Sequence, residues 1–136
     1  MEAIVLDTNC LLQILPRRSP HRWLFDFIRE GQVRLIISTE ILMEYAEILE
    51  QQINHEVADN VIQALIDSPF VQMTVPTYRW QIIQEDPDDD KFVDAAIAAS
   101  AAYLITNNGH FKVLDTTTFP KVNRLRLDDL SPSLFT

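Results

Sequence analysis

Short apolar runs alternate along this chain with longer segments whose apolar residues recur every three or four positions. The runs lie at residues 3–6, 33–37, 70–75 and 103–106, with a further one around 122–127. Continuous apolar runs of this length are typical of parallel strands that are buried on both faces. We therefore predict a central, mainly parallel sheet of four to five strands that is covered by helices on both sides.

The segments between these runs have the apolar period of an amphipathic helix. Pro16 and Gly31 are suitable ends for the first two, and Ser38 or Thr39 is a suitable N-cap for the third. After Asp86, a helix rich in alanine should begin at Pro87 and run to about residue 102. The alternation predicts one α/β domain over residues 1–136, with right-handed crossovers between its strands. The four earlier helices are expected over residues 9–15, 20–31, 39–52 and 55–68.

Length and composition add that the chain should be soluble. A chain of 136 residues can bury a real core, and no stretch approaches the ~20 apolar residues that cross a bilayer. The start of the chain lacks the basic and apolar segments of a secretory signal, and Cys10 is the only cysteine. We expect a cytoplasmic protein without membrane contact.

The net charge of −9 argues against a broad basic surface of the kind that holds duplex DNA. Any contact with nucleic acid must therefore be local. Ordinary solvated side chains are the alternative interpretation for both basic groups of the sequence. The first group is Arg17, Arg18, His21 and Arg22, and the second is Lys121, Arg124 and Arg126.

Asp7 is the first candidate for chemistry, because it ends the apolar run of residues 3–6. Parallel α/β folds bind their ligands at the carboxyl ends of the strands, which is where this carboxylate should emerge. The alternative is that Asp7 only caps the helix that follows, since aspartate is a preferred N-cap. The acids that accompany it must decide between the two.

Asp90 and Asp94 are four residues apart, so they should share one face of the alanine-rich helix. The other faces of this helix are apolar, which predicts that the two carboxylates are partly buried. Like charges about 4 Å apart repel by about 4 kcal/mol at an effective dielectric of about 20, and Asp7 nearby would add to this. A hard divalent cation such as Mg²⁺ or Mn²⁺ is the simplest counter-charge for such an all-oxygen site.

The neighbouring acids are interpreted differently. Asp86, Asp88 and Asp89 lie where a helix begins, and their expected role is to cap it and to oppose its dipole. Glu44 lies at the border of the apolar face of its helix, so its side chain turns either toward a site or toward water.

The residues around Asp7, Glu44 and the segment 86–96 together resemble the acidic motifs of the PIN-domain family. This is a family of compact, metal-dependent ribonucleases that includes many toxins of bacterial toxin–antitoxin pairs. The run Leu6-Asp7-Thr8-Asn9 resembles its first acidic motif, and Ile41-Leu42-Met43-Glu44-Tyr45 is similar to its second. The third and most specific motif is the segment 86–96 followed by Tyr103-Leu104-Ile105-Thr106. The resemblance covers nearly the whole chain and implies a three-layer α/β/α fold.

The resemblance also implies an enzyme that hydrolyses RNA phosphodiester bonds with Mg²⁺ or Mn²⁺. An antitoxin protein is the implied partner, and a homodimer is expected as well. The catalytic candidates are Asp7, Glu44, Asp90 and Asp94, and the candidate metal ligands are Asp7, Asp90, Asp94 and Asn108. Thr8, Asn9 and Thr106 are expected to bond these groups or phosphate, and Arg17, Arg18 and Arg22 to hold the RNA backbone.

The fourth motif departs from the family pattern. The family carries an acid shortly after the strand and threonine, but this chain has Asn108 in that place. The asparagine carbonyl can ligate a metal, although it brings no negative charge and cannot act as a base. His110 is expected to be a packing or surface residue rather than part of the site.

Two other functions are compatible with the same residues. The missing fourth acid suits a weak or inactive nuclease whose acidic groove receives a basic segment of a partner. A phosphatase or phosphotransferase could use Asp7 as a nucleophile, but that pattern wants a second aspartate at position 9, where this chain has Asn9. Trapping a phosphoryl group on Asp7 would support the latter.

Overall fold

A computed structural model describes residues 1–136, and its centre is a parallel sheet of five strands. The strand order is β3-β2-β1-β4-β5, and every neighbouring pair is parallel. β1 therefore lies in the middle, with β2 and β4 on its two sides. The strands are β1 (Ala3–Leu6), β2 (Arg34–Ile37), β3 (Val71–Met73), β4 (Tyr103–Ile105) and β5 (Arg124–Leu125).

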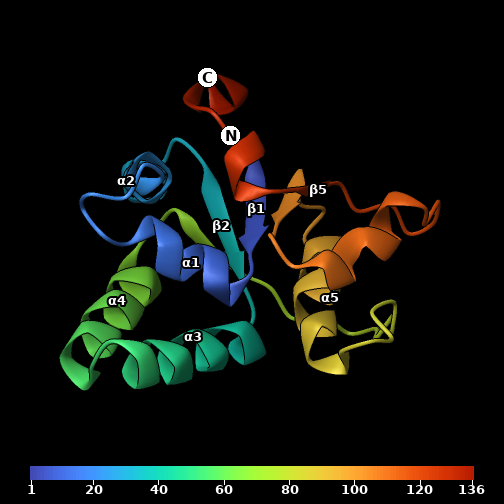
Figure 1. The fold of residues 1–136 in the computed structure, drawn as a ribbon, viewed down its shortest axis with the longest axis horizontal. Coiled ribbons are helices and arrows are strands. Elements are labelled where there is room, and N and C mark those ends of the chain that lie inside the picture. Colours follow the sequence, from blue (N-terminus) through green and yellow to red (C-terminus); the bar gives the residue numbers. More distant parts are fainter.

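Helices cover both sides of this sheet. In Figure 1, α1, α2 and α4 lie to the left of the strands and α5 lies to their right, with α3 running below. This confirms the predicted three-layer α/β/α fold. The α-helices are α1 (Thr8–Ile14), α2 (Arg22–Glu30), α3 (Thr39–Gln52), α4 (His55–Asp67) and α5 (Asp90–Ala98). Short 3₁₀ turns span Pro87–Asp89, Gly109–Asp115, Leu127–Asp129 and Pro132–Phe135.

The predicted starts and ends of the first helices have clear local causes. Ser38 caps α3, because its hydroxyl accepts a hydrogen bond from the Ile41 N–H at 3.2 Å. Gly31 ends α2 with a φ of 77°, and a Cβ added there would lie 2.7 Å from the Phe70 ring. Both the left-handed conformation and the lack of space require glycine at this position.

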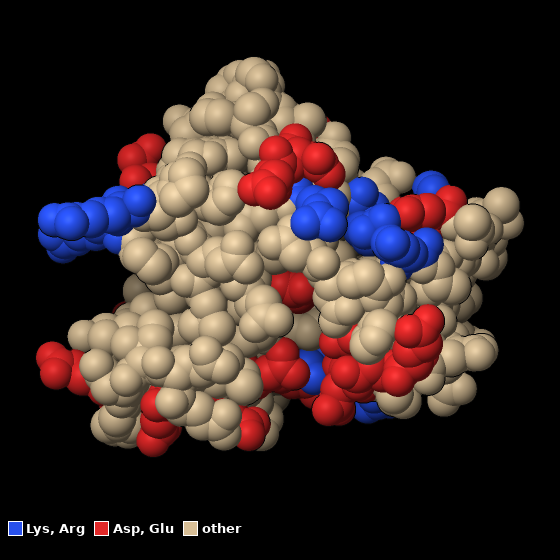
Figure 2. All heavy atoms as spheres, in the orientation of Figure 1, with Lys and Arg blue, Asp and Glu red and all other residues tan.

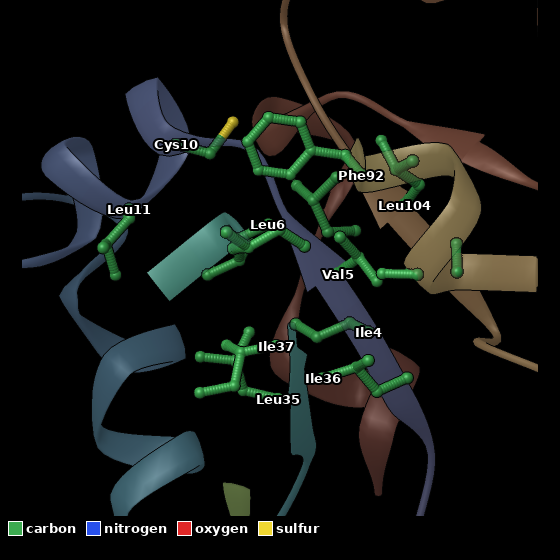
Figure 3. Close-up of a cluster of buried hydrophobic side chains, with 14 of the residues drawn as sticks. Ile4, Val5, Leu6, Cys10, Leu11, Leu35, Ile36, Ile37, Phe92 and Leu104 are labelled. Carbon is green, nitrogen blue, oxygen red and sulfur yellow. The ribbon is translucent and has the colours of Figure 1, made fainter. Parts of the chain in front are cut away.

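The burial of β1 explains why this strand is apolar along its whole length. Ile4, Val5 and Leu6 are fully buried, since β1 has neighbouring strands on both sides and helices over both faces. Figure 3 shows their side chains among those of β2, with Phe92 of α5 next to Leu6. They belong to one contiguous cluster of 30 buried apolar residues, which fixes the position of the residues that follow each strand.

Several predicted elements are shorter than expected. α5 ends at Ala98 rather than near residue 102, because Ser100 takes a φ of 54° and the Ala101 N–H bonds back to the Ala96 carbonyl at 2.9 Å. This pair of features is a Schellman end, which stops a helix. The two edge strands keep only the residues that pair with a neighbour, so β3 and β5 are shorter than the apolar runs 70–75 and 122–127. No helix of this structure has the length and hydropathy to cross a bilayer.

The carboxyl ends of β1 and β4 meet at one edge of the sheet. The Asp7 N–H bonds to the Ile105 carbonyl at 3.1 Å, and the Thr106 N–H bonds to the Leu125 carbonyl at 2.9 Å. The residues that follow these strands are thus held at fixed positions beside each other, at the edge where parallel sheets bind ligands.

Candidate metal centre

Asp7 is almost completely buried at this edge, with 7% of its surface exposed. Its Oδ1 accepts a hydrogen bond from the Cys10 N–H at 2.8 Å, so the residue does cap α1. Its Oδ2 accepts a hydrogen bond from the Thr106 hydroxyl. Asp7 therefore caps α1, as one interpretation of the sequence predicts, and it also presents an oriented carboxylate at the sheet edge. Its role in the chemistry of a site stays a prediction.

A pocket of about 190 Å³ opens beside this carboxylate, and we call it the Asp7 pocket. The face drawn in Figure 2 is hollowed near its centre, and acidic side chains gather in and below the hollow. Basic side chains on this face lie mainly at its left edge and upper right. The lining residues are Asp7, Thr8, Asn9, Glu44, Ile48, Gln52, Asp89, Phe92 and Asn108.

Glu44 turns into the Asp7 pocket rather than toward water. The Thr8 hydroxyl donates a hydrogen bond to its Oε2, and the Lys91 ammonium lies 2.8 Å from its Oε1. Both charged side chains are largely buried, with 26% of Glu44 and 13% of Lys91 exposed. The sequence left the direction of Glu44 open, and Lys91 was not among the predicted site residues.

Asp89 is the acid of the third motif that reaches this pocket. Its side chain is 16% exposed, and burial raises its pKa from 3.8 to about 6. The charges of Asp86 and Asp7 raise the pKa further, while His110 lowers it. Neutralising a carboxylate by a proton or a cation is favoured where burial and like charges disfavour its ionised form.

Asp89 occupies the N-cap position of α5, but its side chain makes no capping hydrogen bond, so the predicted capping role is wrong for this residue. A signal for its direction is present in the sequence. The buried stripe of α5 contains Phe92, Val93 and Ala96. Asp89 precedes these residues by three, four and seven positions, so it continues the stripe toward the sheet edge. The burial of the helix stripe locates this acid better than the spacing of the acids does.

Asp90 and Asp94 share one face of α5, as their spacing predicts, but this face is turned toward the segment before the helix. The Ile83 N–H donates to Asp90 Oδ1 at 2.7 Å, and the Trp80 N–H donates to Asp94 Oδ1 at 3.1 Å. The two carboxylates line a separate pocket of about 410 Å³, which we call the Asp90 pocket. Its other lining residues are Arg79, Gln81, Ile83, Gln84 and Pro87.

The structure thus corrects the expectation that Asp90 and Asp94 gather with Asp7. A helix advances by about 100° per residue, so Asp89 and Asp90 point in clearly different directions. Asp94 is 4% exposed, and burial raises its pKa while the Trp80 N–H lowers it. Main-chain amides already bind both carboxylates, and their predicted role as metal ligands stays a prediction that this geometry does not favour.

Asn108 lines the Asp7 pocket, as the fourth motif implies. Its Oδ1 accepts a hydrogen bond from the His110 N–H at 2.9 Å, and its Nδ2 lies 3.4 Å from Asp89 Oδ2. The amide therefore caps the turn after β4 and points its donor group at an acid of the site. Its carbonyl is occupied by this N–H, so the contribution of Asn108 to a metal stays a prediction.

A second group of ligand atoms lies beside Asp89. One ligand atom each of Asp86, Asp89 and His110 can be chosen so that all lie within 4.8 Å of one another. The buried His110 Nδ1 has no hydrogen-bond partner, and His110 Nε2 lies 3.5 Å from Glu85 Oε2. His110 is thus closer to the candidate centre than the sequence interpretation placed it.

The other predicted residues divide into two groups. Thr8 and Asn9 line the Asp7 pocket, and Thr106 orients Asp7. Arg22 is bound inside the fold, since it donates to the Leu15 carbonyl and lies 3.3 Å from Asp26 Oδ1. The neighbouring arginines at positions 17 and 18 are exposed, so they alone of the three have free guanidinium groups.

The donors of the Asp7 pocket fit a hard divalent cation. Asp7, Glu44 and Asp89 supply three carboxylates from three separate elements, and Lys91 is the basic side chain paired with Glu44. Oxygen donors of this kind suit Mg²⁺ or Mn²⁺ better than softer metals. Such an ion, when bound, activates a water molecule for attack on a phosphate group.

A family model described as PIN domain matches residues 3–110. This range contains β1, every residue of the Asp7 pocket and His110. No curated protein sequence matches the chain.

Solved structures of similar fold cover nearly the whole chain. A VapBC2 structure from Rickettsia felis, bound to a DNA fragment from its promoter, has a TM-score of 0.61 and 17% identity, over 91% of this chain and 98% of that one. DNA-bound VapBC from Salmonella typhimurium has a TM-score of 0.60 and 19% identity, over 93% of this chain and 99% of that one. FitAcB from Neisseria gonorrhoeae has a TM-score of 0.57 and 19% identity, over 93% and 99%. At these identities the likeness is one of fold.

Proposed function

We propose, from the premise that this chain belongs to the PIN-domain family, that it hydrolyses RNA phosphodiester bonds with a divalent metal ion held in the Asp7 pocket. One observation carries the proposal. Asp7, Glu44 and Asp89 converge there from the end of β1, from α3 and from the start of α5. Acids gathered from distant segments into one pocket need a counter-charge beyond the single ammonium of Lys91.

In this proposal Asp7 and Asp89 hold the ion, and the other residues orient the ligands. The Thr106 hydroxyl fixes Asp7 through Oδ2, and the Thr8 hydroxyl fixes Glu44 through Oε2. A bound Mg²⁺ or Mn²⁺ would supply an activated water and would stabilise charge on phosphate oxygens. No residue of the chain has to act as a covalent nucleophile.

The RNA backbone requires positive charge close to an acidic site. Arg17 and Arg18 are exposed, whereas Arg22 is bound within the fold, so we propose the first two as phosphate contacts. A protein with a net charge of −9 attracts RNA only through such local groups. The proposed phosphate contacts are thus these two exposed guanidinium groups.

We further propose that this protein is the toxin component of a toxin–antitoxin pair. The support is the resemblance of the sequence to PIN-domain toxins and the likeness to the proteins of the VapBC and FitAB structures. A basic segment of the partner would suit the acids of the Asp7 pocket. The cytoplasmic location and the homodimer stay predictions.

The test is RNA cleavage by purified protein without a partner. We expect cleavage of a structured RNA with Mn²⁺ or Mg²⁺, complete loss with EDTA, and recovery when metal is returned. Asp7→Asn is the matched control, because it keeps the size of the side chain and removes its charge. Turnover no higher than that of Asp7→Asn, in protein that is folded by circular dichroism, would contradict the nuclease and favour the inactive binding module.

A further inference from the structure

Lys91 is a basic side chain buried among the acids of the candidate centre. Its Nζ lies 2.8 Å from Glu44 Oε1 and donates a hydrogen bond to the Asp88 carbonyl at 2.8 Å. Only 13% of the side chain is exposed, which is unusual for lysine unless its charge is paired. The ammonium is therefore a fixed part of the site.

The position of Lys91 on α5 helps to hold this ammonium in place. Lys91 lies in the first turn of α5, and its Nζ is 5.5 Å from the centre of the Phe92 ring. Lys91 also lines a small cavity together with Ser38 and Asp94. Glu44 thus has one oxygen bound by Lys91 and the other by Thr8.

We propose that Lys91 is a built-in counter-cation that keeps Glu44 out of direct metal coordination and limits the Asp7 pocket to one divalent ion. This inference rests on the metal site of the proposed function. Three carboxylates and one ammonium leave a charge of −2, from 3 acids (Asp7, Glu44 and Asp89) less 1 lysine, which one divalent ion neutralises.

A two-metal arrangement would need an acid that bridges both ions. Two ions about 3.5–4 Å apart form such sites in many nucleases, and Glu44 could bridge them only if its oxygens were released from Thr8 and Lys91. Lys91 pairs the charge of Glu44, whereas Asp7 accepts hydrogen bonds only from the neutral Cys10 N–H and Thr106 hydroxyl. With its charge already paired, Glu44 acts as a positioning residue. It holds Thr8 and Lys91 in place instead of holding metal.

The experiment measures how many Mn²⁺ ions the full-length protein binds, and how tightly, by calorimetry and by electron paramagnetic resonance. We expect one ion for the natural protein and one for Lys91→Arg, which keeps the charge. Lys91→Met frees Glu44 and should bind a second ion. Lys112→Met is the matched control, because Lys112 is exposed on another element and its loss changes the net charge equally.

A second variant tests the same inference without removing Lys91. Glu44→Gln should still bind one Mn²⁺, with an affinity within about threefold of the natural protein. Removal of a residue that only orients a metal ligand typically lowers metal affinity by roughly 10–100-fold, so the loss of a direct ligand should lower it at least as much. A natural protein with two ions, or a Lys91→Met protein with one, overturns the inference alone. Absence of Mn²⁺ binding from every variant contradicts the metal site of the proposed function, and the inference with it.

Discussion

Two acidic pockets lie at the start of α5, and their carboxylates have different partners. In the Asp7 pocket the acids come from three separate elements and are bonded largely by side chains, namely Thr8, Lys91 and Thr106. In the Asp90 pocket both acids come from one helix face and are bonded by main-chain N–H groups of the preceding segment. The Asp7 pocket brings together negative charges from distant segments. The acids of the Asp90 pocket instead bind main-chain N–H groups and so hold the segment before α5 in place.

This difference shows why the spacing of acids does not identify a metal site. Two carboxylates one helical turn apart must lie side by side, whatever they do. Carboxylates that are distant in the sequence lie together only when the fold brings them there.

The largest expected effect is a difference in RNA cleavage between variants of the two pockets. Asp7→Asn should lower kcat/KM for RNA cleavage by roughly 100-fold or more, as expected when a group that stabilises developing charge is lost. Asp94→Asn should leave kcat/KM within about threefold, because its carboxylate binds the Trp80 N–H rather than the proposed metal. Initial rates with Mn²⁺ measure both. Equal losses in the two variants would mean that both pockets take part in the reaction.

The next effect is on stability and should appear in the Asp90 pocket. Asp94→Ala should lower the free energy of unfolding by about 1–3 kcal/mol, because it leaves the partly buried Trp80 N–H without its acceptor. Asp94→Asn should cost less, since an amide oxygen can still accept this hydrogen bond. Urea unfolding in EDTA measures the difference, with the exposed Asp88→Ala as control. An unchanged midpoint for Asp94→Ala would contradict the anchoring role.

A third effect concerns pH and the Asp7 pocket. The folded protein keeps the Asp89 proton up to about pH 6, whereas the unfolded chain releases it near the ordinary value of 3.8. Without metal, the free energy of unfolding should therefore fall as pH rises through this window. Asp89→Asn should remove this dependence and raise Tm by a few degrees at about pH 7, with no gain at about pH 4.

Added Mn²⁺ should reverse this order at about pH 7, because a ligand that binds only the folded state stabilises it. The natural protein should gain Tm with Mn²⁺, and Asp89→Asn should gain much less. A thermal melt at each pH, with EDTA or Mn²⁺, is sufficient. Equal Mn²⁺ shifts for both proteins would remove Asp89 from the metal site.

The smallest effect concerns the backbone of the Asp90 pocket. Gln81 has a φ of 54° between Trp80 and Ile83, whose N–H groups bind the two acids. Since the left-handed conformation costs a residue with a Cβ about 1–2 kcal/mol, Gln81→Gly should be neutral or stabilising by up to about 1 kcal/mol. Urea unfolding measures this small change. Gln84→Gly, in the same segment without a positive φ, should give no gain.

The layer order and the residues at the strand ends follow from the sequence because they depend on local patterns. A fully apolar run such as Ile4-Val5-Leu6 must be buried on both faces, and Asp7 directly after it has to emerge at the carboxyl edge. The direction of Glu44 was left open, because its helix position allows both pocket and water. Thr8 and Lys91 decide it through contacts between distant segments.

Asp89 and Lys91 were missed for a related reason. In the run Asp88-Asp89-Asp90-Lys91, adjacent side chains differ in direction by about 100°, so the choice among them depends on which face of α5 meets the sheet. The irregular segment before α5 binds the face of the helix that carries Asp90. No sequence pattern predicts where the N–H groups of this segment lie. The stripe of Phe92 and Val93 does point to Asp89.

The most direct measurement of the central claim is the position of Mn²⁺ in a crystal of the natural protein, located from its anomalous signal. We expect one peak in the Asp7 pocket, with Asp7 and Asp89 as ligands and Glu44 still paired with Lys91. A peak between Asp90 and Asp94, with the Asp7 pocket empty, would contradict it.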